Sequence, residues 1–186
     1  MGWLELTVSP GFLLLAASLF YVGGGGALTA FLTAALSHEL GHLTALWLVG
    51  AELRRIRVTP CGPVIDYRGG LTRRQEAGVL SAGPLGGLLF ATFAFIVGTP
   101  YFLYTGAVAI LATVFNLLPV MPMDGGRLLC ILLEEMVSPR AAAWILRVCG
   151  SLCAAGVFLT GVMTELPAAA AIGIWMAVLA NVPDLR

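Results

Sequence analysis

Long apolar stretches recur along this chain from Gly11 to its end, and each is bounded by glycine, proline or charge. Several approach the roughly 20 residues that a helix needs to cross a hydrocarbon core. Composition agrees, because 59% of the 186 residues are hydrophobic and only 11% are charged, whereas about a quarter of a soluble domain is charged. The sequence therefore predicts an all-α, polytopic integral membrane protein whose natural surroundings are the lipid bilayer.

About six transmembrane helices are expected, separated by glycine, proline or charged residues that interrupt helical hydrogen bonding. The expected spans are about 10–24, 27–49, 77–97, 102–119 continuing irregularly to about 136, 140–163 and 166–182. We expect a single integral-membrane domain over residues 1–186, with its core at 27–136. No removable signal peptide is expected at the N-terminus.

The arginines predict how these spans are oriented. All ten basic residues are arginine, and six of them lie in the polar stretch 51–76. Basic connections stay on the cytoplasmic side, so this loop and, by alternation of the spans, both termini are predicted to be cytoplasmic. The formal net charge is zero, and without a basic surface no nucleic-acid partner is expected.

The polar loop also carries a strand pattern. Ile56, Val58, Val64 and Ile65 flank the turn-forming stretch 59–63, which predicts a short cytoplasmic β-hairpin. The hairpin either connects two helices or offers an edge that pairs with an extended substrate strand. The sequence does not separate these two functions.

The two histidines of the chain, His38 and His42, lie four residues apart in an apolar helical stretch and enclose Glu39. Four residues are about one helical turn, so both imidazoles share a face and can bind one metal ion, while Glu39 can hold a water molecule beside it. An ionisable residue at membrane depth is costly and usually functional. The motif therefore predicts a zinc site that hydrolyses peptide bonds.

A catalytic zinc usually has three protein ligands, so one further residue is needed. Asp124 is the best candidate, because Asp66 lies in the polar loop and Asp184 near the C-terminus. The prolines and glycines around it, Pro119, Pro122, Gly125 and Gly126, predict a discontinuous membrane segment lining a polar cavity at the zinc site. The alternative is that Asp-Gly-Gly merely ends a helix.

The motif HELGH at 38–42, together with NLLPVMPMDGG at 116–126, resembles the site-2 protease family of intramembrane zinc metalloproteases. The stretch Ala-Gly-Pro-Leu at 82–85 matches the glycine–proline signature of that family. The resemblance implies one Zn²⁺ per chain bound by His38, His42 and Asp124. It also implies that Glu39 is the catalytic glutamate and that Asn116 positions the substrate.

Two features differ from the pattern of many members of that family. Many members carry asparagine shortly after the glycine–proline signature, where this chain has Gly86 and Gly87. We expect neither the PDZ nor the CBS domain of larger members, so the chain resembles a minimal form, similar to the sporulation branch that processes a pro-sigma factor. The implied substrates are membrane-spanning or membrane-associated proteins, with regulatory membrane proteins as further partners, in a bacterial cell membrane.

Two other functions would also use metal ligands inside a helix bundle. A membrane zinc transporter or sensor needs histidine and aspartate, but it does not need Glu39 and would carry more ligands along its path. An inactive scaffold with the same fold would keep the ligands without the reaction. Intramembrane proteolysis uses all the residues of the motif, and we take it as the main hypothesis.

Overall fold

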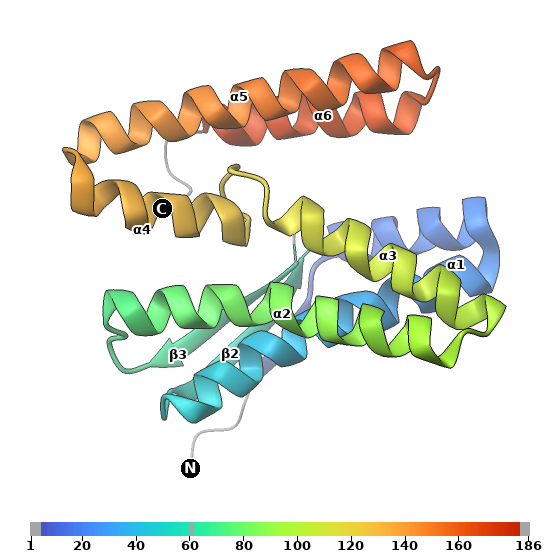
Figure 1. Cartoon of the computed structure of the whole chain (residues 1–186), viewed down its shortest axis with the longest axis horizontal. Helices are drawn as coiled ribbons and strands as arrows, with labels where there is room; N and C mark the ends of the chain where they lie inside the picture. Colours follow the sequence, from blue (N-terminus) through green and yellow to red (C-terminus); the bar gives the residue numbers. More distant parts are fainter. Residues whose placement is uncertain (1–4, 60–61, 183–186) are drawn as a thin grey trace. The chain divides into compact units, whose positions relative to one another are not determined.

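The computed structural model describes residues 5–59 and 62–182. They form two compact units, Met1–Phe115 and Asn116–Arg186, which are described separately below as the N-terminal and C-terminal units. In chain order the elements are β1 (Glu5–Val8), α1 (Pro10–Leu48), β2 (Glu52–Thr59), β3 (Gly62–Arg68), α2 (Arg73–Val97), α3 (Pro100–Asn116), α4 (Asp124–Met136), α5 (Pro139–Met163) and α6 (Pro167–Asn181). The fold is thus mostly helical with one small sheet (Figure 1).

Helix α1 consists of two helical pieces rather than one long rod. Its backbone leaves the helical region at Gly24, where φ is 70° and ψ is −172°, a conformation that glycine tolerates and other residues rarely adopt. The chain changes direction at this break (Figure 1). The break lies where the sequence predicts the turn between spans 10–24 and 27–49.

The predicted β-hairpin is present as the antiparallel pair β2–β3, but the sheet has a third strand that the sequence analysis missed. Strand β1 pairs in parallel with β2, with Glu5 opposite Arg55, and an exposed ion pair of 2.7 Å joins these two side chains. Four residues are too few to give a clear alternating pattern. The strand is identified only by its pairing with β2, from which it is separated in sequence by all of α1.

Helix α2 begins at Arg73, four residues earlier than the predicted span. Thr72 and Gln75 form a capping box there, in which each side chain bonds to the backbone of the other residue. These bonds satisfy amide groups that the first helical turn leaves without partners. The polar residues at the start of α2 therefore extend the helix beyond its apolar part, which a hydrophobicity argument alone does not detect.

Glycines lie where neighbouring helices approach closely. In the N-terminal unit, a Cβ atom on Gly86 of α2 would lie 2.6 Å from the Ser37 carbonyl oxygen of α1. In the C-terminal unit, a Cβ on Gly173 of α6 would lie 2.5 Å from the Phe158 backbone nitrogen of α5. Helices in lipid associate through such close packing of small residues, because lipid tails are as apolar as the side chains themselves.

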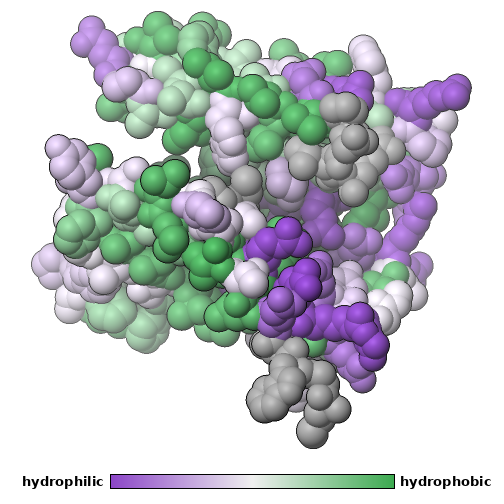
Figure 2. Space-filling view, turned by 180° about the vertical axis from the view of Figure 1, so that it is seen from behind, coloured by the Kyte–Doolittle hydropathy of each residue, from purple (hydrophilic) through white to green (hydrophobic). Residues whose placement is uncertain are grey.

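Helices α1, α2 and α5 are long and apolar enough to cross a membrane, and α3 and α6 are shorter apolar helices. Many large hydrophobic side chains are exposed on them, among them Leu14, Leu89, Leu111 and Leu152 at 68–71%. Figure 2 shows hydrophobic residues over the helices, while hydrophilic residues gather near the strands. An apolar surface of this kind suits a lipid environment; the number of six spans stays a prediction.

The contact at Gly86 generates a prediction for stability. Gly86→Ala should lower the free energy of unfolding by about 1–3 kcal/mol, because its methyl group meets the α1 backbone. Gly78→Ala is the matched control, because a Cβ at Gly78 of the same helix has no neighbour within 4 Å and alanine is the better helix former. Thermal unfolding in detergent measures both variants; equal stability of the two would contradict the proposed contact.

Candidate metal centre

His38 and His42 lie in the second helical piece of α1, and their imidazole rings face each other. Both are buried, at 4% and 8% exposure. Their Nε2 atoms are 3.1 Å apart, with ring centroids 4.9 Å apart and planes inclined by 76°. The helical spacing that the sequence indicates thus brings two nitrogen atoms to one point.

The orientation of His42 is fixed by helix α2. The Nδ1 atom of His42 lies 2.8 Å from the Val79 carbonyl oxygen. A carbonyl oxygen can only accept, so Nδ1 carries the proton and Nε2 keeps its lone pair. Hydrogen bonding of the second imidazole nitrogen to a carbonyl is the usual support of a metal-binding histidine, because it sets both the tautomer and the ring orientation.

The spacing of the two histidines fits a zinc ion. Two nitrogens bound tetrahedrally at about 2.0–2.1 Å from zinc are about 3.4 Å apart, close to the 3.1 Å between the Nε2 atoms here. The lone pair of His42 Nε2 points into this space, and neutral imidazole is a preferred zinc donor. The pair therefore offers two nitrogen donors of the kind that a catalytic zinc needs.

Gly83 of the Ala-Gly-Pro-Leu stretch leaves room for the His42 ring. A Cβ atom at Gly83 would overlap the His42 imidazole, and a Cβ at Gly41 would overlap the Ala82 carbonyl. Two helices can approach this closely only where both lack side chains at the contact. The role of Gly83 is therefore steric: it lets α2 come near enough for Val79 to bond to His42.

Glu39 follows His38 on α1 and is half-buried. The start of strand β3 lies beside it, because a Cβ atom at Gly62 would be 3.7 Å from Glu39 Oε1. Gly62 has a φ of 102°, a conformation that other residues rarely adopt. The sequence analysis assigned the hairpin to the loop but did not detect its approach to Glu39; a glycine in a turn carries no signal for such a contact.

The remaining predicted site residues belong to the C-terminal unit. Asn116 is the last residue of α3, and Asp124 is the first residue of α4. Between them residues 117–123 form no regular helix, which is the discontinuity that the prolines predict. The break is tightly packed. A Cβ atom at Gly125 would overlap the Leu117 carbonyl, and a Cβ atom at Gly126 would lie 2.6 Å from the Val120 carbonyl oxygen.

Comparison with known proteins adds three findings. Residues 99–156 match peptidase family M50. The chain is 29% identical over 163 residues to stage IV sporulation protein FB of Bacillus subtilis (strain 168), covering 81% of this chain and 56% of that protein. The chain thus spans little more than half the length of this relative.

The third finding concerns the fold. The structure resembles the site-2 protease from Methanocaldococcus jannaschii with a TM-score of 0.70 and 21% sequence identity, over 94% of this chain and 88% of that one. Fold and motif together define a helical, membrane-type protein with a paired-histidine metal motif. The chain is thus similar to peptidase family M50 over residues 99–156, to the sporulation protein in sequence and to the site-2 protease in fold.

The contact between Gly83 and His42 generates a prediction for metal binding. Gly83→Ala should displace the His42 ring, break its bond to Val79 and lower zinc affinity by about 10–100-fold, as loss of a supporting contact usually does. Gly78→Ala on the same helix should leave the affinity unchanged. Zinc competition with a chelating dye measures both; an unaltered affinity in a folded Gly83→Ala protein would refute the steric role.

Proposed function

We propose that this chain is an intramembrane zinc metalloprotease that hydrolyses peptide bonds of membrane-spanning or membrane-associated proteins. The observation that carries the proposal is the buried pair His38 and His42, whose Nε2 atoms converge at 3.1 Å on an apolar helix, with Glu39 next in sequence. The match of residues 99–156 to peptidase family M50 and the likeness of the fold to a site-2 protease support the same reaction. Water, the second substrate, would have to reach this site.

Three residues would hold the single zinc ion of each chain. His38 and His42 each offer an imidazole nitrogen, and Asp124 offers a carboxylate oxygen, a donor set able to hold a metal ion. Two nitrogens and one oxygen suit a catalytic zinc, which keeps its fourth position for water or substrate. A bound zinc ion would supply Lewis-acid chemistry, polarising the scissile carbonyl and acidifying water.

The other assigned residues move protons and orient the substrate. Glu39 would accept the proton of the attacking water and deliver it to the leaving nitrogen, as a general base and then a general acid. Asn116, at the end of α3, would position the substrate through its amide. The hairpin, whose β3 strand begins beside Glu39, is the element through which an extended substrate strand could be held.

The proposed topology has six spans within one domain of residues 1–186, with the core at 27–136. Strands β1 and β2 are hydrogen-bonded neighbours, so both ends of α1 lie on one side of any membrane that α1 enters. The break at Gly24 lets α1 cross and return. With the arginine-rich loop 51–76 cytoplasmic, the N-terminus would be cytoplasmic too, and the C-terminus follows by alternation.

The proposed location is a bacterial cell membrane, and the proposed branch is the sporulation branch of the family. Both are supported by the likeness to the sporulation protein of Bacillus subtilis. Regulatory membrane proteins would be partners besides the substrate. A zinc transporter or an inactive scaffold would share the metal ligands. A transporter would not require the carboxylate of Glu39, and an inactive scaffold would not cleave a substrate at all.

Replacement of Glu39 separates the protease from these alternatives. Glu39→Gln keeps the size of the side chain and removes the base, so proteolysis should fall by at least about 10²–10⁴-fold while about one zinc per chain remains bound. Cleavage of a single-span substrate in proteoliposomes and metal analysis of the same sample give the two values. Wild-type cleavage by Glu39→Gln would disprove the hydrolytic mechanism.

Variants of the ligands should behave differently from Glu39→Gln. His38→Ala, His42→Ala and Asp124→Asn should each lose zinc and activity together, because alanine offers no ligand and an amide is a weaker one than a carboxylate. Monodispersity in detergent shows whether each variant folds. Normal zinc content in Asp124→Asn would mean that another residue is the third ligand.

Orientation is tested with single thiols in a cysteine-free background. Arg68 on β3 and Thr164 between α5 and α6 are both exposed, and the proposed topology puts them on opposite sides. In intact cells, a membrane-impermeant reagent should label the thiol of Thr164→Cys and not that of Arg68→Cys. Inverted vesicles should give the reverse pattern; labelling of both from one side would overturn the topology.

A further inference from the structure

Arg147 lies in α5 and is followed there by a long run that contains no further charged residue. It lies sixteen residues before the helix ends at Met163, and it is exposed. Within the described part of the chain no ion pair or hydrogen bond engages its side chain. An arginine in a membrane helix is costly unless it pairs with an anion or reaches the membrane surface. Both conditions can be met together where lipid phosphates lie.

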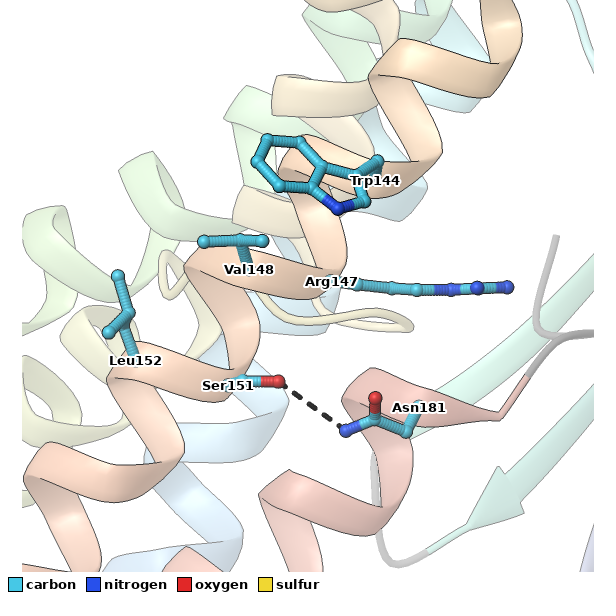
Figure 3. A pocket seen from close by; sticks show the side chains of 6 residues that line it. All are labelled: Trp144, Arg147, Val148, Ser151, Leu152 and Asn181. Carbon is cyan, nitrogen blue, oxygen red and sulfur yellow. Dashed lines mark hydrogen bonds between the residues drawn. The ribbon is translucent and has the colours of Figure 1, made fainter.

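Arg147 is one of the residues that line an open groove of about 410 Å³ within the C-terminal unit. Its lining residues follow one face of α5 and the end of α6: Trp144, Arg147, Val148, Ser151, Leu152 and Asn181. The groove exists because α6 ends at Asn181, beside Ser151, while α5 continues for twelve further residues toward Pro139. Figure 3 shows Arg147 reaching out from α5 between Trp144 and Asn181.

The groove has a polar end and an apolar end. Asn181 Nδ2 donates to the Ser151 Oγ at 3.4 Å and to the Ala177 carbonyl at 2.8 Å. The Ser151 hydroxyl therefore accepts from Asn181 and, within the described residues, keeps its own proton to donate. Val148 and Leu152 line the groove along the same face of α5 and leave that wall apolar.

The depth of the groove corresponds to a membrane surface. Counted from Met163 at 1.5 Å per residue, Arg147 is about 24 Å and Trp144 about 28 Å along α5, and the hydrocarbon core is about 30 Å thick. If the turn after α5 lies at one surface, both side chains lie at the opposite one. Tryptophan is enriched at this level, where lipid phosphates also lie.

We propose that this groove binds the phosphate of an anionic phospholipid. The Arg147 guanidinium would hold two phosphate oxygens through parallel N–H bonds, the Ser151 hydroxyl would donate a further bond, and an acyl chain would follow Val148 and Leu152. Asn181 would act as a positioning residue for Ser151. The inference requires only that α5 spans a membrane, and it is independent of the proposed proteolysis.

The test is a lipid titration of the purified full-length protein in detergent, followed by native mass spectrometry. Phosphatidylglycerol should bind the wild type with an affinity at least about tenfold higher than that of Arg147→Gln, because bonds to charged groups are strong. Arg147→Lys, which keeps the charge without the planar fork, should be intermediate. Arg140→Gln, at an exposed position of the same helix outside the groove, should stay within about twofold of the wild type.

Two further arms separate this lipid from other ligands. A phosphate-free glycolipid should bind the wild type and Arg147→Gln equally, and inorganic phosphate at the lipid's concentration should not displace phosphatidylglycerol. Ser151→Ala should weaken phosphatidylglycerol binding in a protein of unchanged thermal stability. An equal loss in Arg140→Gln, displacement by free phosphate, or unchanged binding by Arg147→Gln would each overturn the proposal; the last would leave Arg147 for an acidic protein partner.

Discussion

The close approach of α1 and α2 is the constraint on which the rest of the histidine site depends. Side chains at Gly41, Gly83 and Gly86 would each overlap the opposite helix. Only at this separation can the Val79 carbonyl accept from His42 Nδ1 at 2.8 Å, and this bond leaves Nε2 facing His38. The orientation of the two histidines is therefore decided by helix packing, and rigid elements hold such geometry better than loops do.

The sequence predicted those features of the fold that arise from local chemistry. The glycine run predicted the break at Gly24, and the prolines predicted the irregular stretch 117–123. The β-branched residues on both sides of a turn-forming stretch predicted the β2–β3 hairpin. Strand β1 was missed because four residues carry too little pattern, and its partner lies about 50 positions away in the chain. The start of α2 was placed too late because its first turn is polar and is stabilised by capping.

The candidate site likewise has parts that the sequence predicts and parts that it does not. His38 and His42 are predictable because helical periodicity alone puts them on one face. The contact of His42 with Val79 is not predictable, because a backbone carbonyl has no residue signature. The approach of β3 to Glu39 is not predictable from the sequence either, because glycine is common in turns for conformational reasons. The role of Asp124 rests on donor chemistry and the family motif, and it stays a prediction.

The parallel pairing of β1 with β2 has a consequence for how the protein is made. Glu5 and Arg55 are opposite each other, so β1 emerges from the ribosome about 50 residues before its partner exists, a wait of about 3–10 seconds at common translation rates. In the proposed topology, α1 would enter the bilayer and turn back at Gly24 during that time, without the sheet. Assembly of the sheet would then be the closing step in the biogenesis of the N-terminal unit, following the insertion of the first helical pair.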